Sequence, residues 1–174
     1  GNPPRTCIAF SITEQIFILV KYGILPETIL TELKSTITLL KENDLEMRAE
    51  AALVAKSLVN KLPVIYSTDK FEPVSIRFRQ QLNENSKMLC WHHKFPELNH
   101  NEIVGWAEGN ASIAVLIFRN DDDFYRTQER MEFTKKMVVA KGASVTEVYS
   151  KGKSFIEKAF YLIYLTDWTS LYIA

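Results

Sequence analysis

From residue 62 onward, short runs of branched apolar residues alternate with longer amphipathic segments. This alternation is typical of βαβ units, whose right-handed crossovers build a parallel sheet with helices on both faces. The sequence therefore predicts the α/β class, as a three-layer α/β/α sandwich with a mainly parallel sheet. Ligands are expected beyond the carboxyl ends of its strands. The predicted strands are 62–66, 88–91, 113–118 and 145–149.

Helices are expected between and after these strands. Three aspartates, at 121–123, precede one of them and can cap its N-terminus. Ser154 is expected to begin another, which reads as a buried helix because Glu157 and Lys158 interrupt its apolar run. The predicted helices are 71–83, 98–106, 124–140 and 155–165.

The first sixty residues lack the alternation and predict a helical lead-in, 1–60, that packs on an α/β domain, 61–174. Apolar residues recur at helical spacing in 16–24, and Gly23 with Pro26 marks a break. Two further amphipathic helices are expected at 28–41 and 47–59.

Composition excludes several classes of function. Lysine plus arginine equals aspartate plus glutamate at 21 each, and no stretch gathers like charge, so neither nucleic acid nor a membrane is an expected partner. Cys7 and Cys90 have no paired spacing, which favours a reducing cytoplasm. His92, His93 and His100 do not have the spacing of metal ligands, so no metal is expected.

Polar residues crowd two places where the chain turns over a predicted sheet edge. Such groups must be solvated or hydrogen-bonded to one another, which favours a site. A helix C-terminus followed by an N-cap cluster is the simpler explanation of the same residues, and composition alone favours it. The two groups are Asn83, Glu84, Asn85 and Lys87, and Asn99, His100, Asn101 and Glu102.

The motifs around these residues resemble a known family. The pattern R-x-x-x-Q-L-N-E-N-x-K at 77–87, followed by P-E-L-N-H-N-E-I-x-G-W at 96–106, is similar to the C-terminal sugar isomerase (SIS) domain of bifunctional phosphoglucose/phosphomannose isomerases. The resemblance implies aldose-ketose isomerisation of glucose, fructose and mannose 6-phosphates without a cofactor. It implies that Glu84 and His100 are catalytic and that Arg5 binds substrate, although an exposed terminal arginine explains Arg5 equally well.

The side chains of Glu84 and His100 are of types that can carry out this isomerisation. One carboxylate can move a proton between C1 and C2 of a sugar through a cis-enediolate, which fits Glu84. An imidazole titrates in the range needed to open the sugar ring, which fits His100. Related isomerases draw this histidine from the neighbouring subunit, so the resemblance implies a homodimer with shared active sites.

The sequence also departs from the family pattern. Members have a first SIS domain with a Ser/Thr-rich phosphate loop and a C-terminal tail with an active-site lysine, and neither has a counterpart here. We therefore expect a truncated half that is inactive alone. The alternative is a non-catalytic SIS module that binds phosphosugars to regulate a partner. Ser67 and Thr68 could bind an anion after the first strand, although helix capping is the competing role.

Overall fold

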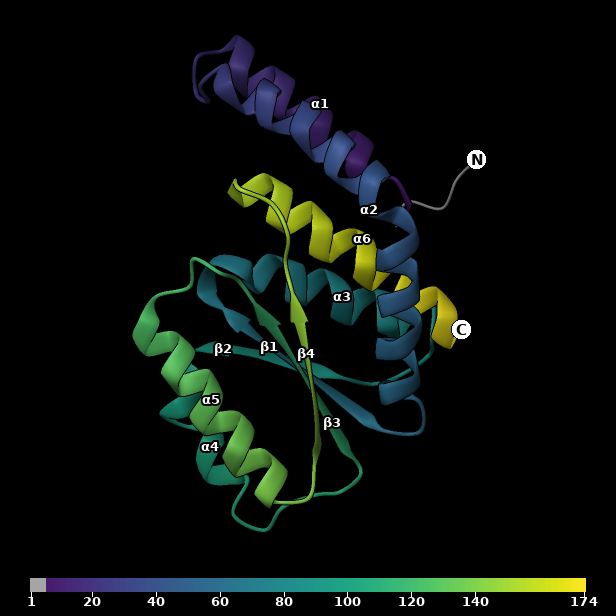
Figure 1. Cartoon of the computed structure of the whole chain (residues 1–174), viewed down its shortest axis with the longest axis vertical. Helices are drawn as coiled ribbons and strands as arrows, with labels where there is room; N and C mark the ends of the chain where they lie inside the picture. The colour runs from purple at the N-terminus through teal and green to yellow at the C-terminus, as the bar shows by residue number, and fades with distance from the viewer. Residues whose placement is uncertain (1–5) are drawn as a thin grey trace.

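Four parallel strands form the centre of the molecule, in the order β2-β1-β3-β4 (Figure 1). The computed structural model describes residues 6–174. All three strand pairings are parallel, with Val64 opposite Trp91 and Leu62 opposite Ile113. The strands are β1 (Leu62–Thr68), β2 (Trp91–Phe95), β3 (Ile113–Arg119) and β4 (Ser144–Tyr149).

Helices cover both faces of this sheet, which confirms the predicted three-layer sandwich. One face is covered by α4 and α5, and the other by α3, α6 and the C-terminal half of α2 (Figure 1). Two short 3-10 helices precede α3 and α4. The helices are α1 (Ile8–Lys21), α2 (Thr28–Leu58), η2 (Asp69–Phe71), α3 (Glu72–Glu84), η3 (Glu97–Asn99), α4 (Glu102–Gly105), α5 (Tyr125–Ala140) and α6 (Phe155–Ile173).

The two central strands explain why the sheet has two hydrophobic cores. Successive side chains of a strand point to opposite faces. Val64 and Tyr66 of β1 therefore pack towards α4 and α5, whereas Ile65 packs towards the other helical layer. β3 is buried along its whole length, as expected for a parallel strand covered on both sides.

The N-terminal helices differ from the sequence expectation. The predicted separate helices 28–41 and 47–59 form one helix, α2, of 31 residues. The polar stretch between them contains neither glycine nor proline, so the helix continues through the expected break. Met47 and Leu58 lie in the domain core, while the N-terminal half of α2 pairs with α1 in a hairpin that extends away from the sheet (Figure 1).

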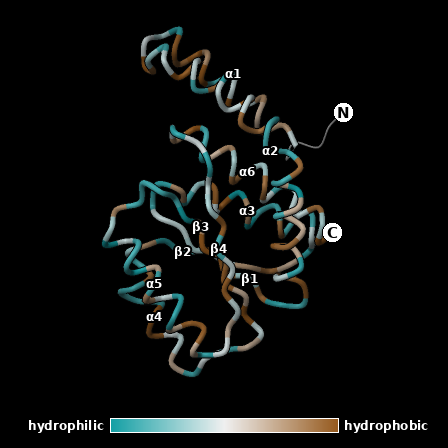
Figure 2. Tube along the Cα trace, viewed as in Figure 1, coloured by the Kyte–Doolittle hydropathy of each residue, from teal (hydrophilic) through white to brown (hydrophobic). Residues whose placement is uncertain are grey.

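Apolar residues occur along this hairpin as well as in the strands (Figure 2). Ile16 is buried, but Phe10 and Phe17 are 68% and 55% exposed. Among residues 6–174, no helix is long and apolar enough to cross a membrane.

The predicted position of the second strand was wrong. It was expected at 88–91, yet β2 occupies Trp91–Phe95. Leu89 is 82% exposed, and the chain first pairs with β1 at Trp91. β2 forms an edge of the sheet and is only half-buried, so its own sequence is too polar to indicate a buried strand.

The three aspartates do not cap α5, contrary to expectation, because the N-cap residue is Phe124 and no side chain caps the helix. Asp121 and Asp122 instead lie 2.5 and 2.6 Å from the ammonium nitrogen of Lys158, whose side chain is only 4% exposed. Their role is therefore to neutralise a buried cation of α6. The predicted helix start at Ser154 is confirmed, because Ser154 and Glu157 form a capping box.

Candidate active site

Glu84 is the last residue of α3 and is exposed to solvent. The helix ends here because the chain turns sharply at Lys87, whose φ angle is 57°. The backbone N–H of Met88 then donates to the Leu82 carbonyl at 3.2 Å, and the Asn83 side chain donates to the Met88 carbonyl at 2.6 Å. These bonds place Glu84 at the rim of a closed turn.

The same turn is tied to the end of α6. Asn85 donates a hydrogen bond of 2.9 Å to the Ser170 hydroxyl, and the Ser86 hydroxyl donates to the Ser170 carbonyl at 2.8 Å. The ammonium group of Lys87 folds back to the backbone carbonyl of Glu84. An exposed carboxylate is thus held on an anchored loop, and the Lys87 cation contacts the backbone of the same residue.

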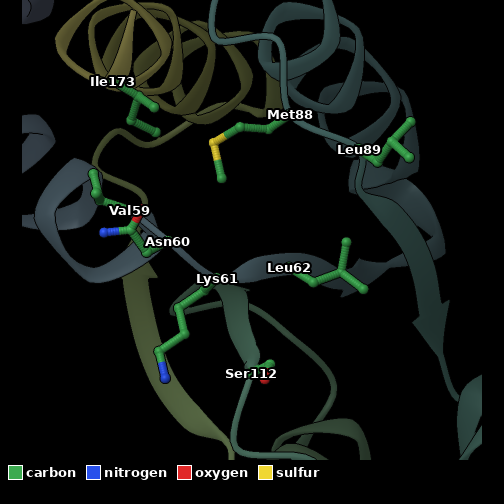
Figure 3. A pocket seen from close by; sticks show the side chains of 8 residues that line it. All are labelled: Val59, Asn60, Lys61, Leu62, Met88, Leu89, Ser112 and Ile173. Carbon is green, nitrogen blue, oxygen red and sulfur yellow. The ribbon is translucent and has the colours of Figure 1, made fainter.

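A hollow lies beside this loop, at the edge where the strands begin (Figure 3). Met88 points into it from the loop. The ammonium of Lys61 is directed away from Met88 and donates to the Ala111 carbonyl at 2.6 Å. Most of the lining is apolar and offers little to hold a phosphate group. The lining residues are Val59, Asn60, Lys61, Leu62, Met88, Leu89, Ser112 and Ile173.

His100 follows η3, beyond the carboxyl end of β2, and is also exposed. Its backbone N–H donates to the Glu97 carbonyl at 2.9 Å. The preceding residues are fixed, since Leu98 is buried and Asn99 donates to the Thr134 hydroxyl of α5 at 2.8 Å. The structure therefore presents an exposed imidazole on an anchored turn.

Aromatic side chains of the sheet hold the other end of this turn. Tyr66 of β1 and Trp91 of β2 both donate to the same carboxylate oxygen of Glu102, the latter at 3.2 Å. The indole of Trp106 donates to the Tyr66 hydroxyl at 3.1 Å. Sequence reasoning included Glu102 among the polar residues but missed Tyr66 and Trp91, because only the strand register brings them together.

Glu84 and His100 do not meet within one chain. α3 starts near the carboxyl end of β1 and returns towards the edge where β2 begins, so Glu84 lies at that edge. His100 lies past the other end of β2. A helix of 13 residues such as α3 is roughly 20 Å long, which gives the scale of the separation. Arg5, the third predicted site residue, lies outside the described residues.

The remaining polar candidates have local roles. Thr68 was expected to cap the following helix, but no side-chain cap is present, and Ser67 accepts a hydrogen bond from Ser75 at 2.8 Å. His92 lies in β2, 3.8 Å from a Glu72 oxygen, and burial lowers the pKa of its imidazole. Within residues 6–174, no group of three or more His, Cys, Asp or Glu side chains could hold a metal ion.

Comparison with known proteins gives a consistent result. The family described as "Bacterial phospho-glucose isomerase C-terminal SIS domain" matches residues 47–174. Among curated proteins, a bifunctional phosphoglucose/phosphomannose isomerase of Caldicellulosiruptor bescii is 33% identical over the whole chain and 54% of its own length. One of the same name from Aquifex aeolicus is 29% identical over the whole chain and 53% of its length. The chain thus spans about half the length of these relatives.

Solved structures share the fold. A glucose-6-phosphate isomerase like protein from Thermus thermophilus superposes with a TM-score of 0.68 over 90% of this chain and 52% of its own, at 20% identity. The C-terminal domain of glucosamine-fructose-6-phosphate aminotransferase from Francisella tularensis superposes with a TM-score of 0.64 over 91% of this chain and 50% of its own, at 16% identity. At these identities the likeness shows the fold alone.

Proposed function

This chain belongs to the family of bacterial phospho-glucose isomerase C-terminal SIS domains, and from that premise we propose that it supplies acid-base groups to an aldose-ketose isomerase of hexose 6-phosphates. The substrates are glucose 6-phosphate and fructose 6-phosphate, together with mannose 6-phosphate. The names of the curated relatives support this substrate class. The observation that carries the proposal is the exposed Glu84 carboxylate on its anchored loop.

Glu84 acts as the proton carrier. Its carboxylate removes the proton from C2 of the open-chain aldose, and the electron pair of that C–H bond moves towards the C1 carbonyl oxygen, which produces a cis-enediolate. Glu84 then delivers its proton to C1, while the proton of the C2 hydroxyl passes to the C1 oxygen and the C2 ketone forms. Lys87 lies close enough to the Glu84 backbone to contribute positive potential where negative charge develops.

His100 opens the sugar ring. The imidazole takes the proton of the anomeric hydroxyl and returns a proton to the ring oxygen, so that the ring C–O bond breaks and the C1 carbonyl forms. Because Glu84 and His100 lie at opposite ends of the sheet, we assign the histidine to the site of a second copy. A two-fold homodimer would then have two shared sites, each with Glu84 of one subunit and His100 of the other.

In this proposal the phosphate group of the substrate is not bound in the hollow beside the Glu84 loop. The hollow beside Glu84 is mostly apolar, and its cation, Lys61, donates to the Ala111 carbonyl. The relatives are about twice as long as this chain, so the proposed phosphate site lies in sequence outside it, and Arg5 is left the role of a cation that stabilises the enediolate. Accordingly, residues 1–174 alone should bind hexose phosphate weakly and turn over very little.

The test uses a protein that carries this sequence at the length of its relatives. A coupled assay with glucose and mannose 6-phosphates measures conversion to fructose 6-phosphate. Glu84→Gln is expected to lower kcat by about a thousandfold or more, since it removes the proton carrier. Glu108→Gln, at an exposed carboxylate outside the proposed site, is the matched control. Full activity of the Glu84→Gln protein would refute the assignment, and binding without turnover by the unmodified protein would favour a regulatory module.

A further inference from the structure

Glu102 lies two residues after His100 and is joined to the sheet by two different strands. The buried Tyr66 hydroxyl of β1 and the Trp91 indole of β2 donate to the same oxygen of its carboxylate. Trp106 donates in turn to the Tyr66 hydroxyl. A chain of hydrogen bonds therefore runs from Trp106 through Tyr66 to Glu102.

In this chain of bonds the Tyr66 hydroxyl stays protonated and acts as the donor to Glu102. Burial, and then the hydrogen bond to Glu102, raise the pKa of Tyr66 far above its ordinary value. The phenol consequently remains a proton donor, and its acceptor is a carboxylate, which makes the bond one of the stronger kinds of hydrogen bond. Tyr66 is fully buried, so solvent does not compete for its hydroxyl.

The bonds of Glu102 complete the fixation of the His100 turn. On the preceding side, the Asn99 amide is bonded to Thr134 of α5. On the following side, the Asn101 side chain accepts a hydrogen bond from the Glu102 backbone N–H at 2.6 Å. Because the residues on both sides of His100 are hydrogen-bonded, the backbone of the turn is restricted. The exposed imidazole is therefore presented from a fixed position.

We propose that Glu102 is a positioning residue, which fixes the place at which His100 is presented by clamping its turn to Tyr66 and Trp91. The inference rests on the ring-opening role of His100 proposed above. Ring opening requires the imidazole to reach the anomeric hydroxyl and the ring oxygen in one placement, and small displacements of a catalytic group cost large factors in rate. In this role Glu102 does not touch the sugar.

Ring opening can be measured apart from isomerisation, because reclosure of an opened aldose ring scrambles the α and β anomers. The experiment uses the protein at the length of its relatives with Glu84→Gln present throughout, which removes C1–C2 proton transfer. Exchange between the anomers of glucose 6-phosphate is followed by two-dimensional exchange NMR, and substrate affinity by calorimetry.

In this background, Glu102→Leu is expected to slow enzyme-catalysed anomer exchange about tenfold or more, with the Kd for glucose 6-phosphate changed less than about twofold. Glu102→Gln keeps an oxygen that can accept from Tyr66 and should retain most of the exchange rate. Glu108→Leu, at an exposed carboxylate outside the turn, should leave the rate unchanged. A loss of affinity and exchange together in Glu102→Leu, without recovery in Glu102→Gln, would overturn the proposal.

Two further variants separate this inference from its premise. His100→Asn with unchanged exchange would refute the ring-opening role, and the inference would fall with it. His100→Asn with lost exchange, beside Glu102→Leu with full exchange, would refute the positioning role alone. Should Glu102→Leu not fold, Tyr66→Phe decides the matter, because it removes one of the two donors. An unchanged rate of anomer exchange in Tyr66→Phe would contradict the clamp. A slower rate with an unchanged Kd for glucose 6-phosphate would support it.

Discussion

Arg77 of α3 donates a hydrogen bond of 2.6 Å to Asp167 of α6. Gln81, one helical turn further along α3, donates to the other oxygen of the same carboxylate at 3.1 Å. Asp167 therefore fixes the orientation of the helix that ends at Glu84. The Arg77 side chain is 12% exposed and that of Asp167 is 30% exposed, so the pair is partly shielded from water.

Asp167→Ala is expected to lower the free energy of unfolding by about 2 kcal/mol, because it removes two hydrogen bonds, one of them to a charged partner. The matched control is Glu46→Ala, whose carboxylate pairs with Lys151 but is 62% exposed, and which should change stability by less than about 1 kcal/mol. Urea unfolding of residues 1–174 measures both. Equal losses in the two variants would contradict the structural role of Asp167.

The capping box of α6 predicts an acid-sensitive contribution to stability. The backbone N–H groups of Ser154 and Lys153 donate to the Glu157 carboxylate, and this holds the pKa of Glu157 below its usual 4.5. Because the pKa of Glu157 is lower in the folded protein than in the unfolded protein, its contribution to stability is complete above a pH of about 4.5. That contribution is lost as the pH falls through the folded-state pKa. Glu157→Gln should cost about 1 kcal/mol at pH 7 and almost nothing near pH 2.

Urea titrations of both proteins between pH 7 and pH 2 measure this convergence. Glu108→Gln serves as the control and should follow the unmodified protein at every pH. A constant difference between the Glu157→Gln protein and the unmodified protein would show that the carboxylate does not titrate as described.

The Cys90 thiol should be unreactive. Burial raises the pKa of Cys90 to about 11, so that roughly one molecule in a thousand carries the thiolate at pH 8. In a Cys7→Ser protein, where Cys90 is the only cysteine, labelling by iodoacetamide at pH 8 should be at least about tenfold slower than in the same protein unfolded in guanidinium. Labelling at equal rates in the two states would contradict the burial of this thiol.

Two glycines after the His100 turn should respond in opposite ways to alanine. Gly109 has a φ angle of 72°, and a Cβ atom there would lie 2.4 Å from the Lys141 carbonyl oxygen. Gly109→Ala should therefore cost about 2 kcal/mol or more. Gly105, the last residue of α4, has open space around its Cβ position, so Gly105→Ala should be neutral or stabilise by up to about 1 kcal/mol. Thermal unfolding distinguishes the two, and a destabilised Gly105→Ala protein would contradict this description.

The fold followed from local patterns wherever burial was strong on both faces. β1 and β3 are almost wholly buried and were predicted within one or two residues of their ends. β2 was misplaced because an edge strand is half-solvated, and its polar residues carry less signal than the apolar Met88 and Leu89 before it. The break predicted within α2 was wrong for a similar reason. A polar stretch indicates exposure to solvent and does not by itself end a helix.

Long-range polar contacts were beyond what local sequence could indicate. The aspartates at 121–123 look like a helix cap, but the partner of Asp121 is Lys158, which lies 37 positions away in the chain. The Tyr66–Glu102 bond likewise joins residues 36 positions apart, and it depends on the crossover that places β1 beside β2. By contrast, the exposed turns of Glu84 and His100 were visible as local concentrations of polar residues.

The most direct test asks whether two inactive proteins restore each other. At the length of the relatives, the Glu84→Gln protein and the His100→Asn protein are each expected to be inactive in the isomerase assay. After unfolding and refolding of an equal mixture, half of the dimers should be mixed, and each mixed dimer should have one site with both native residues. Recovery of roughly one quarter of the unmodified activity is expected. Recovery of no activity above that of the separate variants would contradict a site shared between Glu84 of one subunit and His100 of the other.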